Sequence, residues 1–217
     1  MITNTYLMAV SPSENGETVI CKIKYSEDGN VKMIKIPIAY SFYSDAGYPL
    51  DLDGPFPLDV VRFEELVDLS KVTSAINKGL DLLNYSVCSK KGIKDKLVMK
   101  GFDKETSEKA AEFLSDNGFI NEKSQAEFYV AEMAQKKLYG KNRIKNELFK
   151  KGYRQDVIND VLENTDLDFE EICRTRIEMT MRKKDFSDQK SASKNVNALM
   201  RYGFTFSEIK SALRNMK

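Results

Sequence analysis

The sequence contains no histidine, and it has only three cysteines in 217 residues. Histidine is the commonest general base and metal ligand of proteins, so its absence argues against acid–base catalysis and against a metal centre. Cys21, Cys88 and Cys173 are odd in number and widely separated, and no CxxC pair occurs. We therefore expect neither a zinc site nor a disulfide framework, and a reducing cytoplasmic setting is the simplest one for this chain.

Sequence patterns for nucleotide binding and for membranes are absent as well. Neither the phosphate loop GxxxxGK(S/T) nor the dinucleotide pattern GxGxxG occurs. No apolar run approaches the length of a membrane span, and the segment MITNTYLMAV lacks the basic start and the cleavage site of a signal peptide. We expect a cytoplasmic protein that is not an enzyme, needs no cofactor and does not enter a membrane.

One acidic stretch invites a metal-site interpretation. The segment DLDGPFPLD places Asp51, Asp53 and Asp59 close together, as in a calcium-binding loop. It lacks the third loop carboxylate and the closing glutamate that an EF-hand loop requires. A turn-rich connector is therefore the favoured interpretation.

Residues 1–72 predict a small antiparallel β-rich domain. Three segments rich in β-branched and aromatic residues alternate with the hairpin signals Asn15-Gly16 and Asp28-Gly29. We predict a three-stranded meander with strands at Ile2–Val10, Thr18–Tyr25 and Asn30–Ile38. Residues 39–57 contain Pro49, Pro55 and Pro57, so we expect irregular structure there, followed by a short helix at about Leu58–Leu69.

A period of 51 residues runs through the rest of the chain. Gly101, Gly152 and Gly203 follow this spacing, and each has a leucine four positions before it and an aromatic residue directly after it. Glycine suits the left-handed residue that ends a helix. The leucines are Leu97, Leu148 and Leu199, and the aromatic residues are Phe102, Tyr153 and Phe204. Such a period is typical of a helical repeat, because short helices cannot bury their apolar stripes alone.

Residues 73–217 predict helices throughout, and N-capping patterns precede several of them. The capping residues are Ser89, Asp103, Asn121 and the pairs Asp168/Glu171 and Thr205/Glu208. The predicted helices are Ser74–Asn84, Lys90–Met99, Lys104–Leu114, Glu122–Leu138, Lys141–Lys150, Gln155–Glu163, Phe169–Lys183, Ala192–Arg201 and Phe206–Asn215. They agree with the period, so we predict a mainly α fold with three tandem three-helix modules at about 73–118, 119–165 and 166–217.

Charge is distributed unevenly. Residues 1–72 carry 6 Lys/Arg against 11 Asp/Glu, and residues 73–217 carry 28 against 22. The densest basic block lies in the central repeat and supplies the candidate contact residues Lys141, Arg143, Lys145, Lys150, Lys151 and Arg154. Such a block can dock on phosphates or on an acidic protein surface. Helical spacing puts Arg143 and Lys150 on one flank of the Ile144/Leu148 seam, and ordinary solvated flanks are the alternative interpretation.

The central repeat carries a family resemblance. The segment YGKNRIKNELFKKGYRQDVINDVLE resembles the central repeat of the RecX family, which are bacterial regulators of the recombinase RecA. The segments INKGLDLLNYSVCSKKGIKDKLVMKGF and NVNALMRYGFTFSEIKSAL resemble the flanking copies, so the resemblance covers about residues 73–217. It implies three modules in an elongated curved array that binds in the groove of the RecA–DNA filament and inhibits strand exchange and the RecA ATPase.

Two classes of function follow. The first is a regulator of DNA repair, recombination and the SOS response, as the resemblance implies. We expect this regulator to be a monomer that binds RecA filaments and single- or double-stranded DNA. The second is a generic helical-repeat module that binds nucleic acid or another protein without acting on RecA. Binding to RecA with and without DNA separates these two hypotheses.

Overall fold

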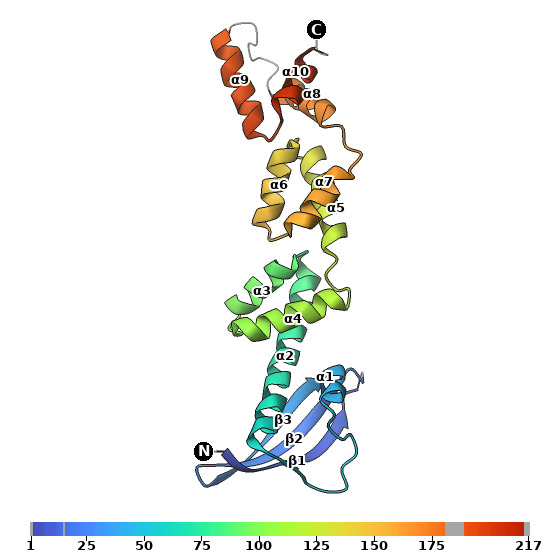
Figure 1. Cartoon of the computed structure of the whole chain (residues 1–217), viewed down its shortest axis with the longest axis vertical. Coiled ribbons are helices and arrows are strands. Elements are labelled where there is room, and N and C mark those ends of the chain that lie inside the picture. Colours follow the sequence, from blue (N-terminus) through green and yellow to red (C-terminus); the bar gives the residue numbers. More distant parts are fainter. Residues whose placement is uncertain (1, 15, 181–188, 215–217) are drawn as a thin grey trace. The chain divides into compact units, whose positions relative to one another are not determined.

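The computed structural model describes residues 2–14, 16–180 and 189–214 (Figure 1). The chain divides into two compact units: Met1–Ser86 with Ile93–Phe119, and Val87–Gly92 with Ile120–Lys217. Within the described residues, the first unit holds all the strands and the second is built from helices. The prediction of a mainly helical chain with a small N-terminal sheet is confirmed.

The first unit contains a four-stranded antiparallel sheet in the order β3-β2-β1-β4. The long strands β1 (Ile2–Pro12), β2 (Thr18–Glu27) and β3 (Asn30–Ala39) are those of the predicted meander. Asp28 and Gly29 close the β2–β3 hairpin with φ values of 49° and 81°, as a two-residue turn of the predicted kind requires. The turn signal at Asn15 lies outside the described residues.

The expectation of irregular structure over residues 39–57 is wrong at both ends of that segment. Helix α1 (Tyr40–Asp45) buries Tyr43, and β4 (Phe56–Leu58) pairs with β1, so the sheet has four strands rather than three. The proline at position 57 does not prevent β4 from forming, because β4 is a short edge strand and an edge strand tolerates a missing N–H.

A single helix, α2 (Val60–Tyr85), stands where two helices were predicted. Asp59 caps it, since its carboxylate accepts a 2.8 Å hydrogen bond from the backbone N–H of Arg62. The helix continues through residue 72, the predicted domain boundary. Between the two predicted helices, Thr73 is buried: it accepts a 2.8 Å hydrogen bond from the backbone N–H of Ala39 and donates one to the carbonyl of Leu69.

The core of the first unit lies between α2 and one face of the sheet. Phe63 and Leu66 of α2 pack in one cluster with Leu7, Ile23 and Ile38 of the strands. Beyond the sheet, α2 packs against α4 (Lys104–Asp116), and α3 (Lys90–Met99) adds the buried side chains of Ile93 and Leu97.

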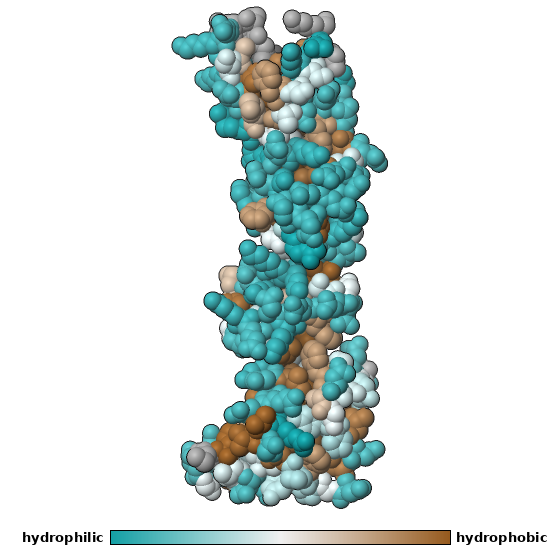
Figure 2. All heavy atoms as spheres, viewed as in Figure 1, coloured by the Kyte–Doolittle hydropathy of each residue, from teal (hydrophilic) through white to brown (hydrophobic). Residues whose placement is uncertain are grey.

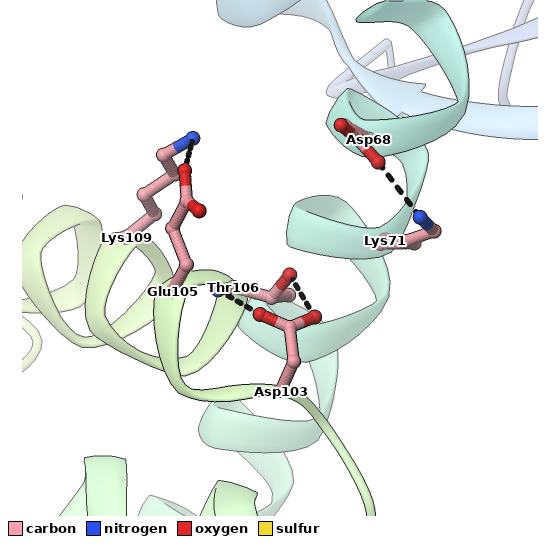
Figure 3. Close-up of polar contacts among 6 residues, drawn as sticks. All are labelled: Asp68, Lys71, Asp103, Glu105, Thr106 and Lys109. Carbon is pink, nitrogen blue, oxygen red and sulfur yellow. Dashed lines mark hydrogen bonds and ion pairs between the residues drawn. The ribbon is translucent and has the colours of Figure 1, made fainter. Parts of the chain in front are cut away.

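Figure 3 shows how α4 begins beside α2. The Asp103 carboxylate accepts hydrogen bonds from the backbone N–H and the hydroxyl of Thr106, at 2.8 and 2.7 Å, which confirms the predicted N-cap. These hydrogen bonds, led by the one from the backbone N–H, hold the pKa of Asp103 below its ordinary value. The neighbouring pairs Lys71–Asp68 and Lys109–Glu105 are exposed, so they contribute little to stability.

The second unit is built from helices that closely follow the sequence-based predictions. They are α5 (Glu122–Gln135), α6 (Lys141–Lys150), α7 (Gln155–Glu163), α8 (Phe169–Thr180), α9 (Gln189–Arg201) and α10 (Phe206–Arg214). Helix α5 ends three residues before the predicted Leu138, which has a positive φ of 50°. The predicted ends of two helices, Lys183 and Asn215, lie outside the described residues.

Predicted caps in the second unit are confirmed by their hydrogen bonds. Asn121 accepts from the backbone N–H of Ser124 at 3.0 Å. Thr205 and Glu208 form a reciprocal capping box, because each side chain accepts from the other residue's backbone N–H, at 3.3 and 2.7 Å.

Three helices end in the same glycine turn, 51 residues apart. Gly101, Gly152 and Gly203 have φ values of 97°, 87° and 96°. In each turn the N–H of the following aromatic residue donates to the carbonyl of the leucine five positions earlier, as in a Schellman motif. These pairs are Phe102–Leu97 at 3.2 Å, Tyr153–Leu148 at 3.2 Å and Phe204–Leu199 at 3.4 Å. All three leucines are fully buried.

Truncation of Leu148 tests this seam. We expect Leu148→Ala to lower the free energy of unfolding by roughly 2–5 kcal/mol, because the side chain is 0% exposed and its removal leaves a cavity. Phe149→Ala is the matched control, since the neighbouring ring is 62% exposed and its loss should cost below about 0.5 kcal/mol. Urea unfolding measures both variants, and a loss below about 1 kcal/mol for Leu148→Ala would contradict the assignment.

Candidate functional site

The six basic residues predicted as contact residues all lie on or directly after α6, in the second unit. Helix α6 turns Ile144 and Leu148 into the core, where both are fully buried. The structure therefore distributes the basic side chains around the rest of the helix and its glycine turn. They do not form one uniform surface, because some are engaged by the protein itself and others are exposed.

Lys145 is engaged by the neighbouring helix. Its ammonium group donates a 3.0 Å hydrogen bond to the side-chain oxygen of Asn159 on α7. Lys141 lies on the same flank of α6, and both residues are partly buried. This flank therefore lies beside α7, and its charges reach solvent only in part.

Arg143 contacts two aromatic rings. Its guanidinium carbon lies 4.3 Å from the centroid of the Tyr139 ring and 5.3 Å from that of Tyr202. One guanidinium nitrogen also donates a 3.4 Å hydrogen bond to the carbonyl of Arg201. Arg143 therefore joins α6 to the end of α9, and it is not the freely solvated residue that helical spacing suggests.

Arg176 is a second cation of this junction, and it is not among the residues predicted to contact a partner. It is 7% exposed, and its guanidinium donates to the backbone carbonyls of Lys137 and Leu138 at 2.9 and 3.2 Å. Its guanidinium carbon lies 3.2 Å from the centroid of the Tyr202 ring. The Arg176 guanidinium thus satisfies two carbonyl groups that closely follow α5, which ends earlier than predicted. No local pattern reveals this role, because its partners are 38 and 39 residues away.

Close backbone contacts complete the junction. The backbone N–H groups of Gly140 and Asn142, at the start of α6, donate to the carbonyls of Tyr202 and Gly203 at 2.8 and 3.1 Å. A Cβ at Gly140 would overlap the backbone of Gly203, and a Cβ at Gly203 would overlap Arg143. The N-terminus of α6 therefore rests on the C-terminal turn of α9, an arrangement that places opposite ends of two helix dipoles together.

The opposite end of α6 meets residues 87–92 in a similar way. The Ser89 hydroxyl accepts from the backbone N–H of Gly92 at 3.1 Å, as predicted for an N-cap, and donates to the carbonyl of Lys151 at 2.9 Å. A Cβ at Gly152 would lie only 2.9 Å from the Ser89 hydroxyl oxygen. The glycine turn after α6 is therefore required by its neighbour as well as by its own φ.

The exposed cations of the block lie around this second turn. The side chains of Lys150 and Arg154 are 71% and 68% exposed. Lys150 makes a long 3.5 Å contact with Glu147, and Arg154 pairs with Asp156 at 2.8 Å. The exposed Lys151 extends over the Tyr129 ring, 4.5 Å from its centroid. Figure 2 shows that the face around α6 is mostly hydrophilic in this view, with a few hydrophobic side chains among the hydrophilic ones.

The three cysteines offer no reactive thiol. All are buried. Burial raises the pKa of the Cys21 and Cys173 thiols to about 12, so both are protonated at neutral pH. Within the described ranges, no group of three or more His, Cys, Asp or Glu side chains could hold a metal ion, and no helix is long and apolar enough to cross a membrane.

These features define a mainly helical protein with a small N-terminal sheet, glycine-terminated helices at a fixed period, and a basic central helix. No family model matches the chain. It is 26% identical over 195 residues to "Regulatory protein RecX" of Clostridium perfringens (strain SM101), covering 86% of this chain and 91% of that relative. It is 27% identical over 180 residues to the protein of the same name from Caldanaerobacter subterraneus, covering 80% and 87%.

Solved structures give the same result for the fold. A crystal structure of regulatory protein RecX has a TM-score of 0.71 at 20% identity, over 95% of this chain and 99% of its own. The crystal structure of RecX from Lactobacillus salivarius has a TM-score of 0.59 at 25% identity, over 67% and 96%. In sequence and in fold, the chain is therefore similar to proteins named RecX.

Replacement of Gly203 tests the junction. Gly203→Ala should weaken hydrogen-exchange protection in α6 and α9, because the new Cβ is strained at positive φ and also overlaps Arg143. Gly101→Ala is the matched control: its φ is 97°, but a Cβ there meets nothing within 4 Å. We expect the Gly203 variant to lose at least about 1 kcal/mol more local stability than the control. Equal losses would mean that the close contact is not important.

Proposed function

We propose that this protein regulates the recombinase RecA by binding the RecA–DNA filament, and that it lowers RecA's DNA-dependent ATPase and strand exchange. The observation that carries the proposal is the likeness to proteins named "Regulatory protein RecX" over about nine-tenths of their length. Regulation by binding also suits a chain with buried cysteines and without histidine.

We further propose that the contact surface lies around the glycine turn after α6, with Lys150, Lys151 and Arg154 as its centre. These three cations are exposed and follow one another closely, so they can meet phosphates or carboxylates of a partner. Lys141, Arg143 and Lys145 belong to the same block but contribute less, because all three side chains are partly buried.

The modular organisation supports a partner made of repeated subunits. We propose that residues 73–217 act as three three-helix modules, following the three equivalent glycine turns. The small domain at 1–72 precedes them. A binder that spans several RecA subunits can disturb many with one copy, so inhibition at less than one protein per RecA monomer is expected.

Charge reversal of two exposed cations tests the function and the surface together. Lys150→Glu/Arg154→Glu should need roughly tenfold more protein for half-inhibition of the RecA ATPase, equivalent to about 1.4 kcal/mol of binding free energy. Lys71→Glu/Lys78→Glu is the control, since it makes the same change of charge at exposed positions on α2. Arg143 is unsuitable for this test because its reversal would break the contacts with Tyr139 and Tyr202.

The outcomes separate two errors. If the folded Lys150/Arg154 variant inhibits as well as the unmodified protein, the proposed surface is wrong and the function stands. If the unmodified protein neither binds nor inhibits the RecA of its own host, the RecA function is wrong. The alternative, a helical-repeat module that binds another protein or nucleic acid, then takes its place.

Direct binding to DNA provides an independent measurement. The basic block should bind DNA weakly and with little preference for sequence, because lysine and arginine here meet phosphates rather than base edges. We expect log K to fall linearly with log salt, with a slope of roughly −0.7 for each phosphate contacted on a single strand. Fluorescence anisotropy over a salt series measures this. Affinity that is independent of salt would contradict the prediction.

A further inference from the structure

The sheet of the first unit has two unlike faces. One face is buried against α1 and α2 through residues such as Leu7 and Ile23. The other face is formed by the alternate residues of the same strands and stays accessible: Tyr6 is 37% exposed, Met33 is 52% exposed, and Lys35 is exposed. This outer face has no part in the function proposed above.

Three lysines gather on the outer face without acidic partners. The strand register places Lys22 directly opposite Lys35, and Lys24 follows two residues further along β2. No aspartate or glutamate occupies an outward position of β1, β2 or β3 between these residues. Among the described residues, no hydrogen bond or ion pair engages the three ammonium groups.

This arrangement is unfavourable unless an anion is present. Like charges directly opposite each other across two strands destabilise a sheet. The Cβ atoms of such a pair are about 5 Å apart, and outward residues along one strand are about 7 Å apart. The lysines therefore concentrate positive charge in a small area, in a segment whose net charge is negative (6 Lys/Arg against 11 Asp/Glu in residues 1–72). An anionic ligand would relieve the repulsion.

A tyrosine ring and a methionine thioether lie among the three lysines. Tyr6 lies opposite Lys24 across β1 and β2, and Met33 lies opposite Lys24 across β2 and β3. A surface that combines ammonium groups with an exposed aromatic ring suits single-stranded nucleic acid, in which phosphates and unstacked bases are both accessible. A duplex keeps its bases stacked, so it offers no partner to the ring.

We propose that this outer face, formed by Tyr6, Lys22, Lys24, Met33 and Lys35, is a binding surface for single-stranded nucleic acid. The lysines meet the phosphates and Tyr6 stacks on a base. The surface is distinct from the basic block around α6, and its action does not require RecA.

The test uses the full chain and fluorescein-labelled oligothymidine, measured by anisotropy over a salt series without RecA. Lys22→Gln/Lys35→Gln should weaken binding by roughly tenfold or more at 0.1 M salt and reduce the salt slope by about 1.4, since each phosphate contact on a single strand contributes about 0.7. Lys71→Gln/Lys109→Gln removes the same charge from α2 and α4 of the same unit and should leave the slope unchanged.

A second pair of variants tests the stacking. Tyr6→Ala should weaken oligothymidine binding by roughly tenfold, the loss expected for one stacked base, and should have little effect on duplex binding. Tyr40→Ala is its control, because Tyr40 is exposed to a similar extent (43%) but lies on α1.

Three outcomes would overturn the proposal. The first is equal loss of affinity in the sheet variant and its charge-matched control. The second is equal loss for oligothymidine and for a duplex of the same length. The third is a sheet variant that keeps its affinity for oligothymidine but loses affinity for phosphatidylserine vesicles. That result would mean that the face binds a lipid surface. None of these depends on whether RecA is inhibited, so failure here leaves the proposed function standing.

Discussion

The contact between the start of α6 and the glycine turn after α9 is the constraint on which the second unit depends. Backbone N–H groups of Gly140 and Asn142 reach the carbonyls of Tyr202 and Gly203 only because neither glycine carries a Cβ. The contact joins two helix ends whose polar groups would otherwise need water or side chains. Arg143 and the buried Arg176 both contact the Tyr202 ring, so aromatic and cationic side chains add to the contact that the backbone forms.

This joint divides the basic residues by role. Arg143 and Arg176 hold the protein together, and Lys145 is bonded to α7. Lys150, Lys151 and Arg154 remain exposed around the next glycine turn. Counting charges along the sequence cannot make this division, because the sequence does not distinguish an arginine or lysine packed on an aromatic ring from one exposed to solvent. Binding surfaces are therefore better chosen from exposure than from charge density.

The chain carries positive charge in two different settings. Around α6 the cations stand on helical flanks and after a tight turn, where they can reach a partner's phosphates or carboxylates. On the outer face of the sheet, Lys22 and Lys35 are fixed opposite each other by the strand register, with Tyr6 nearby. The two settings suit different tasks, since a sheet presents a flat array and a helix presents a narrow row.

The sequence alone determined the glycine period, several helix caps and the three long strands. Glycine at positive φ, a capping aspartate such as Asp103, and the Asp28-Gly29 turn act over a few residues, so local patterns are sufficient to predict them. The sequence also located the basic block, which lies on and directly after α6. Tertiary structure decided the continuity of α2, where Thr73 is buried, and the pairing of β4 with β1. It also decided the role of Arg176, because contacts between residues nearly forty positions apart depend on packing that no local pattern records.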